Sequence, residues 1–132
     1  MRHPKAIAWE DKLKSVFDRI DDRLEDRYGR RYPLHPNRPP RGTTANREFD
    51  GLFDIGAAFS AGYGSAIGRG YVVEIRMATP ARVPPSVMKK IEREVVNMLG
   101  EELKKEFPGR KLRVNRDGPV YKIHGDLSLG GV

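Results

Sequence analysis

The fold class of this chain is indicated by residues 71–107, which read YVVEIRMATPARVPPSVMKKIEREVVNMLGEELKKEF. In Tyr71–Ala78, apolar residues alternate with a mixed set of side chains, which is the period of a β-strand with one apolar face. Over Pro85–Phe107 the apolar residues recur every three or four positions instead, which predicts an amphipathic helix. The change of period predicts a strand followed by a helix, and therefore a chain that mixes both element types.

A second amphipathic helix is predicted earlier in the chain, over Ala8–Tyr28. Its apolar residues form one stripe along about six helical turns, and the opposite face is charged. The stripe consists of Trp9, Leu13, Val16, Phe17, Ile20, Leu24 and Tyr28. It must bury against the rest of this chain or against a second copy of the same helix.

Three further strands are predicted from alternation and turn signals. Phe49–Ser60 is predicted to pair with Tyr71–Ala78 as an antiparallel hairpin, joined by the glycine-rich loop Ala61–Gly70. Asp117–Gly118 is a strong signal for a tight turn, and the strands that flank it are predicted at Lys111–Asn115 and Val120–His124.

These elements predict a single α+β domain in the order helix, strand, strand, helix, strand, strand. A two-layer arrangement, with about four strands in a mixed or antiparallel sheet and both helices on one face, hides both apolar stripes. If the second and third strands are neighbours, they form a right-handed crossover through the second helix. Along the chain we distinguish the N-terminal helix (1–28), a basic proline-rich segment (29–48) and an α+β core (49–132).

The composition excludes several classes of protein. The chain has 132 residues, enough for one domain, and no cysteine, which excludes disulfides, thiolate metal sites and thiol catalysis. No stretch approaches the roughly 18 apolar residues of a membrane span, and the first residues lack the apolar core of a signal peptide. The sequence therefore predicts a cytoplasmic protein with no cofactor, no metal ion and no membrane contact.

The positive charge is concentrated in Arg27–Arg47, which we call the basic stretch. Its sequence, RYGRRYPLHPNRPPRGTTANR, holds six arginines and no acidic residue, and it accounts for nearly all of the formal net charge of +7. Its prolines exclude helix and central strand and favour an extended form. A block of like charge is typical of a segment that contacts an anionic partner.

The arginines of the basic stretch are the candidate contacts to phosphate, because a guanidinium offers a rigid fork of donors. An aromatic side chain among them is the candidate for stacking on an unpaired base, and one arginine of the glycine-rich loop is a further candidate. The full set is Arg27, Arg30, Arg31, Arg38, Arg41, Arg47, Tyr32 and Arg69. The alternative is that these arginines pair with the acidic face of the preceding helix, at Asp18, Asp22, Glu25 and Asp26.

The glycine-rich loop has backbone N–H groups that could face an anion. Its glycine spacing differs from that of a dinucleotide-binding loop, and it leads into a strand rather than into a helix whose N-terminus would hold the phosphate. We therefore expect a flexible hairpin loop, with glycines where φ is positive or where another backbone comes close. These glycines are Gly62, Gly64, Gly68 and Gly70.

Two weaker patterns concern catalysis and metal binding. Ser60 lies in an Ala-Phe-Ser-Ala-Gly segment and His124 follows it in the chain, but no helix follows Ser60 as a nucleophile elbow requires. His124 and Asp126, with Asp117 in the nearby turn, form a histidine–carboxylate cluster, which offers fewer ligands than a protein zinc site. We therefore predict neither a catalytic residue nor a metal site.

The sequence favours a small non-enzymatic binding protein that contacts RNA or DNA through the basic stretch. One alternative is an assembly protein that self-associates through the first helix, by Trp9, Leu13, Phe17, Ile20 and Leu24. A second is an enzyme for a small ligand or a phosphate that uses the glycine-rich loop with Ser60, Ser65 or His124.

Overall fold

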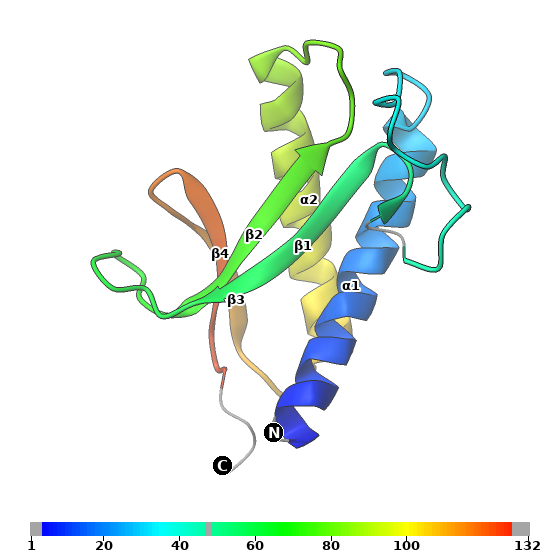
Figure 1. The fold of residues 1–132 in the computed structure, drawn as a ribbon. Coiled ribbons are helices and arrows are strands. Elements are labelled where there is room, and N and C mark those ends of the chain that lie inside the picture. The colour runs from blue at the N-terminus through cyan, green and yellow to red at the C-terminus, as the bar shows by residue number, and fades with distance from the viewer. Residues whose placement is uncertain (1–3, 47–48, 128–132) are drawn as a thin grey trace.

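The computed structural model describes residues 4–46 and 49–127 of the chain. Within these residues it contains two helices and four strands in the predicted order, which confirms the α+β class (Figure 1). Their bounds are α1 Pro4–Tyr28, β1 Phe53–Ser60, β2 Gly70–Met77, α2 Pro85–Glu106, β3 Leu112–Asp117 and β4 Val120–Gly125. The largest differences from the predicted bounds are the earlier start of α1 and the later start of β1.

The strands form one antiparallel sheet in the order β1-β2-β4-β3. β1 and β2 pair along their whole length, from Phe53 opposite Met77 to Ser60 opposite Gly70. β4 lies between β2 and β3 and is antiparallel to both. The predicted alternative of a mixed sheet with a crossover is therefore wrong for the described residues: β3 runs in the same direction as β2, but β4 separates them.

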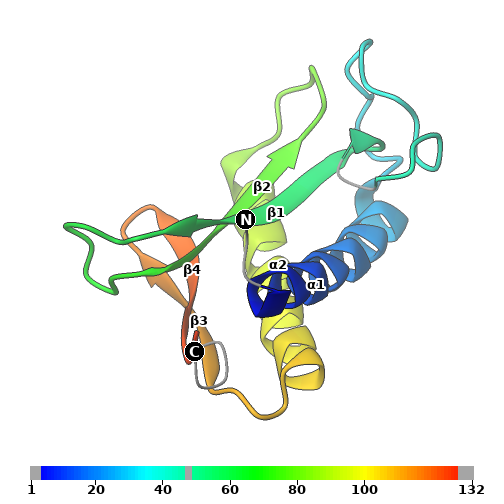
Figure 2. The same ribbon diagram turned by 60° about the horizontal axis from the view of Figure 1, so that its bottom comes forward.

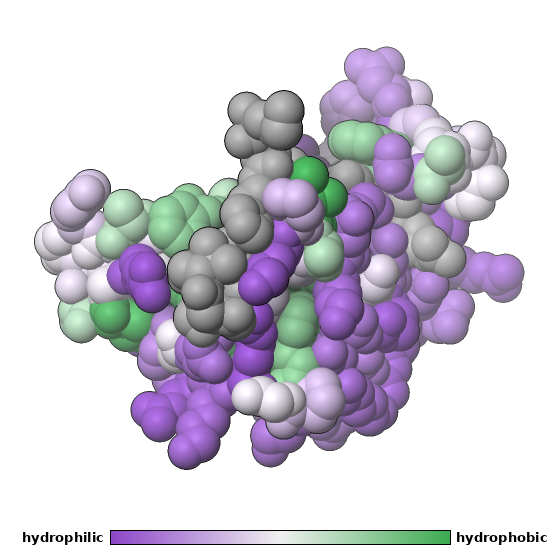
Figure 3. All heavy atoms as spheres, turned by 90° about the horizontal axis from the view of Figure 1, so that it is seen from below, coloured by the Kyte–Doolittle hydropathy of each residue, from purple (hydrophilic) through white to green (hydrophobic). Residues whose placement is uncertain are grey.

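Both helices lie on the same face of the sheet and run in opposite directions (Figure 1 and Figure 2). The core forms where their apolar stripes meet the odd-numbered residues of β1 and β2 and the middle of β4. Among its residues with no more than 4% exposure are Phe17, Ile20, Phe53, Val95 and Ile123. Seen from below, the helical side presents mostly hydrophilic side chains (Figure 3). Two amphipathic helices thus cover one face of the sheet, as their periodicity predicted.

The apolar stripe of α1 is buried against the rest of the same chain. None of the residues predicted for self-association is more than 6% exposed: Trp9, Leu13, Phe17, Ile20 and Leu24. The Trp9 ring lies 4.4 Å from that of Phe107, centroid to centroid, and its indole N–H donates to the Tyr71 hydroxyl at 3.0 Å. A second copy could reach this stripe only if α1 left the sheet. Self-association of the chain through its first helix stays a prediction.

The β3–β4 hairpin turns on Gly118 and Pro119, one residue later than the predicted Asp117–Gly118 turn. Gly118 has a φ of 64°, which lies in the left-handed region that glycine adopts without steric cost. Asp117 is therefore the last residue of β3, opposite Val120, and it is only 8% exposed. The shift moves the Asp117 carboxylate from a solvated turn into the sheet.

Gly70 allows β2 to approach β4 closely. A Cβ at this position would lie 2.5 Å from the carbonyl oxygen of Ile123, whereas a Cβ at Gly56 in β1 would meet nothing within 4 Å. Gly70→Ala should therefore lower the free energy of unfolding by about 2 kcal/mol, because the β4 backbone must move. Gly56→Ala is the matched control and should change it by less than about 0.5 kcal/mol.

Urea denaturation followed by the fluorescence of Trp9, the single tryptophan of the chain, measures both changes. An equal loss of stability in the two variants would contradict the close approach of β2 to β4.

Candidate functional site

The segment between α1 and β1 carries most of the basic stretch, and we call its described residues, 29–46 and 49–52, the connector. It folds back along the C-terminal half of α1 (Figure 1), where Arg41 holds it. The Arg41 guanidinium forms ion pairs with Asp21 at 2.7 Å, with Asp22, and with Asp50 at 3.3 Å. The predicted alternative, that arginines of the basic stretch pair with the acidic face of the first helix, is therefore confirmed for Arg41.

Asp50 is the acceptor around which the connector folds. Its carboxylate is 1% exposed and accepts the backbone N–H groups of Gly42 at 3.1 Å and Thr44 at 3.0 Å, and the Thr44 hydroxyl at 3.1 Å. Burial alone would raise the pKa of Asp50, but these hydrogen bonds and the Arg41 charge outweigh it and hold the pKa below its usual value. The connector is thus a compact loop around a carboxylate, not the extended chain that its prolines predicted.

Arg38 fixes the end of the connector to the start of β1. Its guanidinium donates to the carbonyl oxygens of Asp50 at 3.2 Å, Gly51 at 3.0 Å and Phe53 at 3.0 Å. Glu25 of α1 accepts the N–H of Phe53 at 2.8 Å, and burial raises the pKa of Glu25. Like Arg41, Arg38 therefore has partners within the chain, which explains why both are partly buried despite their charge.

Three arginines in the described part of the basic stretch remain at the surface. The Arg27 side chain is 58% exposed, although it pairs with Glu94 of α2 at 3.0 Å. Arg30 and Arg31 are exposed, and the Arg31 guanidinium lies 5.1 Å from the centre of the Tyr28 ring. They border a hollow of about 530 Å³, which we call the arginine hollow. Its lining consists of Glu25, Asp26, Arg27, Gly29, Arg30, Arg31 and Arg41.

The remaining predicted contacts do not join this group. Tyr32 is half-buried and packs against the core. Arg69 is exposed, but it lies beyond the other end of the eight-residue β1, and a strand of that length spans roughly 25 Å (Figure 1). The prediction that Arg69 joins the same surface is therefore wrong. Arg47 lies outside the described residues.

The glycine-rich loop holds an anion, but this anion is a side chain of the same protein. The N–H groups of Ala66 and Ile67 donate to the Asp117 carboxylate at 3.3 and 3.4 Å. The Lys122 ammonium, 2% exposed, donates to Asp117 at 2.8 Å and to the Ser65 hydroxyl at 3.2 Å. The hydrogen bond from Lys122 lowers the pKa of Asp117. The loop is therefore docked on the β3–β4 hairpin, not the flexible hairpin loop we expected.

Ser65 and Lys122 are close enough to raise the question of a serine–lysine catalytic pair. A lysine acts as a general base only as a neutral amine. In this structure Lys122 is instead a donor, to the Asp117 carboxylate at 2.8 Å and to the Ser65 hydroxyl at 3.2 Å. The contact is structural: it fastens the glycine-rich loop to the sheet.

Ser60 and His124, the other candidates for an enzyme, are not brought together. Ser60 ends β1 and His124 lies on β4, with β2 between them, so about two strand spacings, or roughly 10 Å, separate their backbones. The His124 ring instead lies 2.8 Å from the side-chain oxygen of Asn115. Asp126 faces Arg110 at 4.0 Å. Within residues 4–46 and 49–127, no three histidine or carboxylate side chains are grouped to hold a metal ion.

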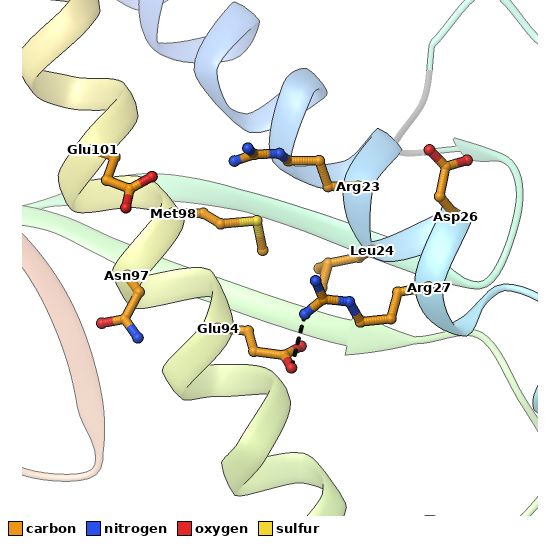
Figure 4. Close-up of a pocket in the computed structure, with 8 residues that line it drawn as sticks. All are labelled: Arg23, Leu24, Asp26, Arg27, Glu94, Asn97, Met98 and Glu101. Atoms are coloured by element: carbon orange, nitrogen blue, oxygen red, sulfur yellow. Dashed lines mark ion pairs between the residues drawn. The ribbon is translucent and has the colours of Figure 1, made fainter.

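A second hollow, which the sequence did not predict, lies between α1 and α2 (Figure 4). It measures about 580 Å³, and the Arg27–Glu94 ion pair crosses it. Its lining consists of Arg23, Leu24, Asp26, Arg27, Glu94, Asn97, Met98 and Glu101. Asp26 and Arg27 border this hollow and the arginine hollow alike, so the two adjoin each other along the last turns of α1. Its one signal in the sequence is the set of charged side chains that flank both apolar stripes.

The similarity to known proteins extends over nearly the whole described fold. A family model with the description "Uncharacterised protein" matches residues 4–125, a range that includes both helices, all the strands of the sheet and the arginine hollow. The chain belongs to this family. An "Uncharacterized protein" of Borreliella burgdorferi is 42% identical over 125 residues, which cover 95% of this chain and 98% of that relative. No solved structure matches the chain. Neither helix in the described residues has the length and apolar character needed to cross a membrane.

Asp21 is the group that we expect to make stability depend on pH near neutrality. It is 1% exposed, and its burial, which the Arg41 charge offsets only in part, raises its pKa from 3.8 to about 7. Between these two values the folded chain binds more protons than the unfolded chain. The free energy of unfolding should therefore fall as the pH rises towards about 7 and level off above it, with a slope of up to about 1.4 kcal/mol per pH unit.

Asp21→Asn should remove the contribution of Asp21 to this slope, because an amide does not titrate, while Asp22 and Asp50 still pair with Arg41. Asp22→Asn is the matched control, since it removes a neighbouring carboxylate that is half-exposed and leaves Asp21 in place. Urea denaturation at several values between about pH 5 and pH 8 measures both slopes. If the slope persists unchanged in Asp21→Asn, the raised pKa of Asp21 is wrong.

Proposed function

We propose that the protein is a small non-enzymatic binding protein that contacts a polyanion, RNA or DNA, through Arg27, Arg30 and Arg31. The observation that carries the proposal is that these exposed guanidinium groups border one hollow at the end of α1. Arg38 and Arg41 belong to the scaffold, because their partners lie within the connector, α1 and β1. They hold the loop that follows the exposed arginines.

Further basic side chains support the proposal because they lie at the same end of the molecule. The N–H of His35 in the connector donates to the carbonyl of Ala78 at 2.9 Å, which joins the connector to the loop before α2. The first turns of α2 follow this loop (Figure 1). The exposed basic residues of the loop and these turns are Arg82, Lys89, Lys90 and Arg93. A surface with such an excess of positive charge attracts phosphate groups and raises the rate of encounter.

Two features oppose tight binding and limit what the surface can recognise. Glu25 and Asp26 border the hollow and reduce its positive potential, although Glu25 is directed towards the N–H of Phe53. Tyr32 packs against the core, so only part of its ring is available for stacking on a base. We therefore expect affinity to come from phosphate contacts, with little reading of base sequence.

The double variant Arg30→Gln/Arg31→Gln tests this proposal without disturbing Arg38 or Arg41. We expect the wild type to bind a labelled single-stranded RNA or a DNA duplex at about 50 mM salt, with log affinity falling linearly against log salt. Each lost phosphate contact should make that slope less steep by about 0.7 to 0.9, so the slope of the double variant should be less steep by roughly 1.5. Fluorescence anisotropy across a salt series measures the change.

Lys104→Gln/Lys105→Gln is the matched control. It removes the same charge from the last turn of α2, at the opposite end of that helix from Lys89 and Lys90. Its salt slope should stay close to that of the wild type. Absence of wild-type binding at low salt would overturn the proposal, and an equal loss in the control would show that the arginine hollow is not the binding surface.

A further inference from the structure

β1 is an edge strand whose outward backbone groups are only partly used. The Leu52 carbonyl accepts the N–H of Ala78, whereas the N–H and C=O of Phe53 point the other way, to Glu25 and Arg38. Because orientation alternates along an antiparallel strand, the backbone groups of Ile55, Ala57 and Phe59 also point outward. In the described residues the sheet has no further strand on that side, so β1 presents three donors and three acceptors along its edge.

A groove lies directly beside this edge, between β1 and the first half of α1. It measures about 410 Å³. Its apolar lining comes from Leu13, Phe17, Ile55, Ala57, Phe59 and Tyr71, and its rim from Glu10, Asp11, Lys14 and Asp18. The apolar residues of β1 in this lining are those whose backbone groups face outward. A strand added to β1 would therefore direct every second side chain into the groove.

The two edges of the sheet differ in how they are protected against pairing. Edge strands usually carry charged residues or proline, which discourage a further strand. β3 fits this rule, with Arg113 and Arg116 exposed. β1 has the sequence FDIGAAFS, whose one charged residue, Asp54, pairs with Arg76 of β2. The β1 edge thus lacks the protection that the β3 edge has.

Exposed apolar side chains are found beside the same groove. Phe59 is 59% exposed and Ile7 is 42% exposed. Ile7 precedes Glu10 and Asp11 by three and four positions, so it continues the wall that α1 contributes to the groove. A segment bound in the groove would cover this apolar surface.

The charge of the groove rim decides which occupant fits best. The rim has three carboxylates and one ammonium, and that ammonium, Lys14, pairs with Asp18 at 3.1 Å. If a second copy paired its β1 with this β1, the α1 helix beside each strand would bring the same carboxylates together, which is unfavourable. A basic segment meets no such repulsion.

We propose that β1 accepts an extended segment of another protein as an additional strand, with apolar side chains at alternate positions and lysine or arginine beside them. The segment pairs with the backbone of Ile55, Ala57 and Phe59, places its apolar side chains in the groove, and meets the carboxylates of α1 with its basic ones. This surface lies along β1 and the first half of α1, away from the arginine hollow, so the inference does not depend on the polyanion proposal.

The probe is a fluorescein-labelled peptide of about nine residues, the span of a strand that covers β1, with valine alternating with threonine and lysine at both ends. We expect saturable binding by fluorescence anisotropy, together with slower amide hydrogen exchange at Ile55, Ala57 and Phe59 by NMR. A copy that is N-methylated on alternate amides of the pairing edge should bind at least about tenfold more weakly, because it loses donors to β1. A copy with glutamate in place of lysine should also bind more weakly.

Two protein variants localise the site. Ala57→Pro removes an outward N–H but no bond to β2, and it should weaken peptide binding about tenfold. Glu10→Gln/Asp11→Gln should weaken it about fivefold through the lost charge, whereas the matched control Glu92→Gln/Glu101→Gln on α2 should leave it unchanged. Arg30→Gln/Arg31→Gln should also leave peptide binding unchanged, which separates this surface from the polyanion site.

Several outcomes would overturn the inference. These are equal binding of the N-methylated peptide, equal binding of the glutamate peptide, or no change in amide exchange along β1. A mass of the protein alone that rises with concentration, and that Ala57→Pro returns to the monomer, would show that a second copy takes the edge instead. The peptide controls and the exchange measurement use the wild-type chain, so the test stands even where Ala57→Pro fails to fold.

Discussion

The position of the Arg41 guanidinium between Asp21, Asp22 and Asp50 determines how the connector lies and where β1 begins. Asp21 and Asp50 are each 1% exposed, and an uncompensated charge at such a site is strongly destabilising. One guanidinium compensates the two unequally. Asp50 also accepts backbone N–H groups, and its pKa stays below the usual value. The contact from Arg41 to Asp21 is an ion pair without the alignment of a hydrogen bond, and burial raises the pKa of Asp21 to about 7. The fold tolerates this imbalance because the same contacts hold the connector against α1.

Two loops of the chain have the same arrangement: each is too long for a tight turn and folds around a buried carboxylate. In the connector the carboxylate is that of Asp50, held by backbone N–H groups and Arg41. In the glycine-rich loop it is that of Asp117, held by backbone N–H groups and Lys122. In both loops, groups that the sequence suggested for phosphate binding donate to a carboxylate of the same chain instead. Only basic side chains that do not hold a loop in place are available to an external anion. This is why we assign the proposed function to the arginine hollow and not to the whole basic stretch.

The sequence predicted those parts of the structure that depend on periodicity. Both apolar stripes, the order of elements and the two-layer packing follow from residues spaced along single helices and strands. Strand order did not follow, because placing β4 rather than β3 beside β2 is a matter of long-range pairing. The turn at Gly118 and Pro119 was misplaced by one residue, which hid the buried position of Asp117. For the candidate site, the sequence predicted phosphate contacts at Arg27, Arg30 and Arg31, but it could not separate them from Arg38 and Arg41, whose partners are backbone carbonyls and carboxylates brought close only by folding.

The acidic residues of α1 divide the molecule into two surfaces of different chemistry. In the second half of the helix, Asp21 and Asp22 pair with Arg41, and the arginines around the end of the helix make this end basic. Nearer the start of the helix, Glu10, Asp11 and Asp18 lie with Lys14 on the groove rim, beside the edge strand β1. The connector thus shapes both surfaces: at one end Arg41 pairs with carboxylates of α1, and because the connector stops at the start of β1, the acidic residues and the open strand edge remain together at the other.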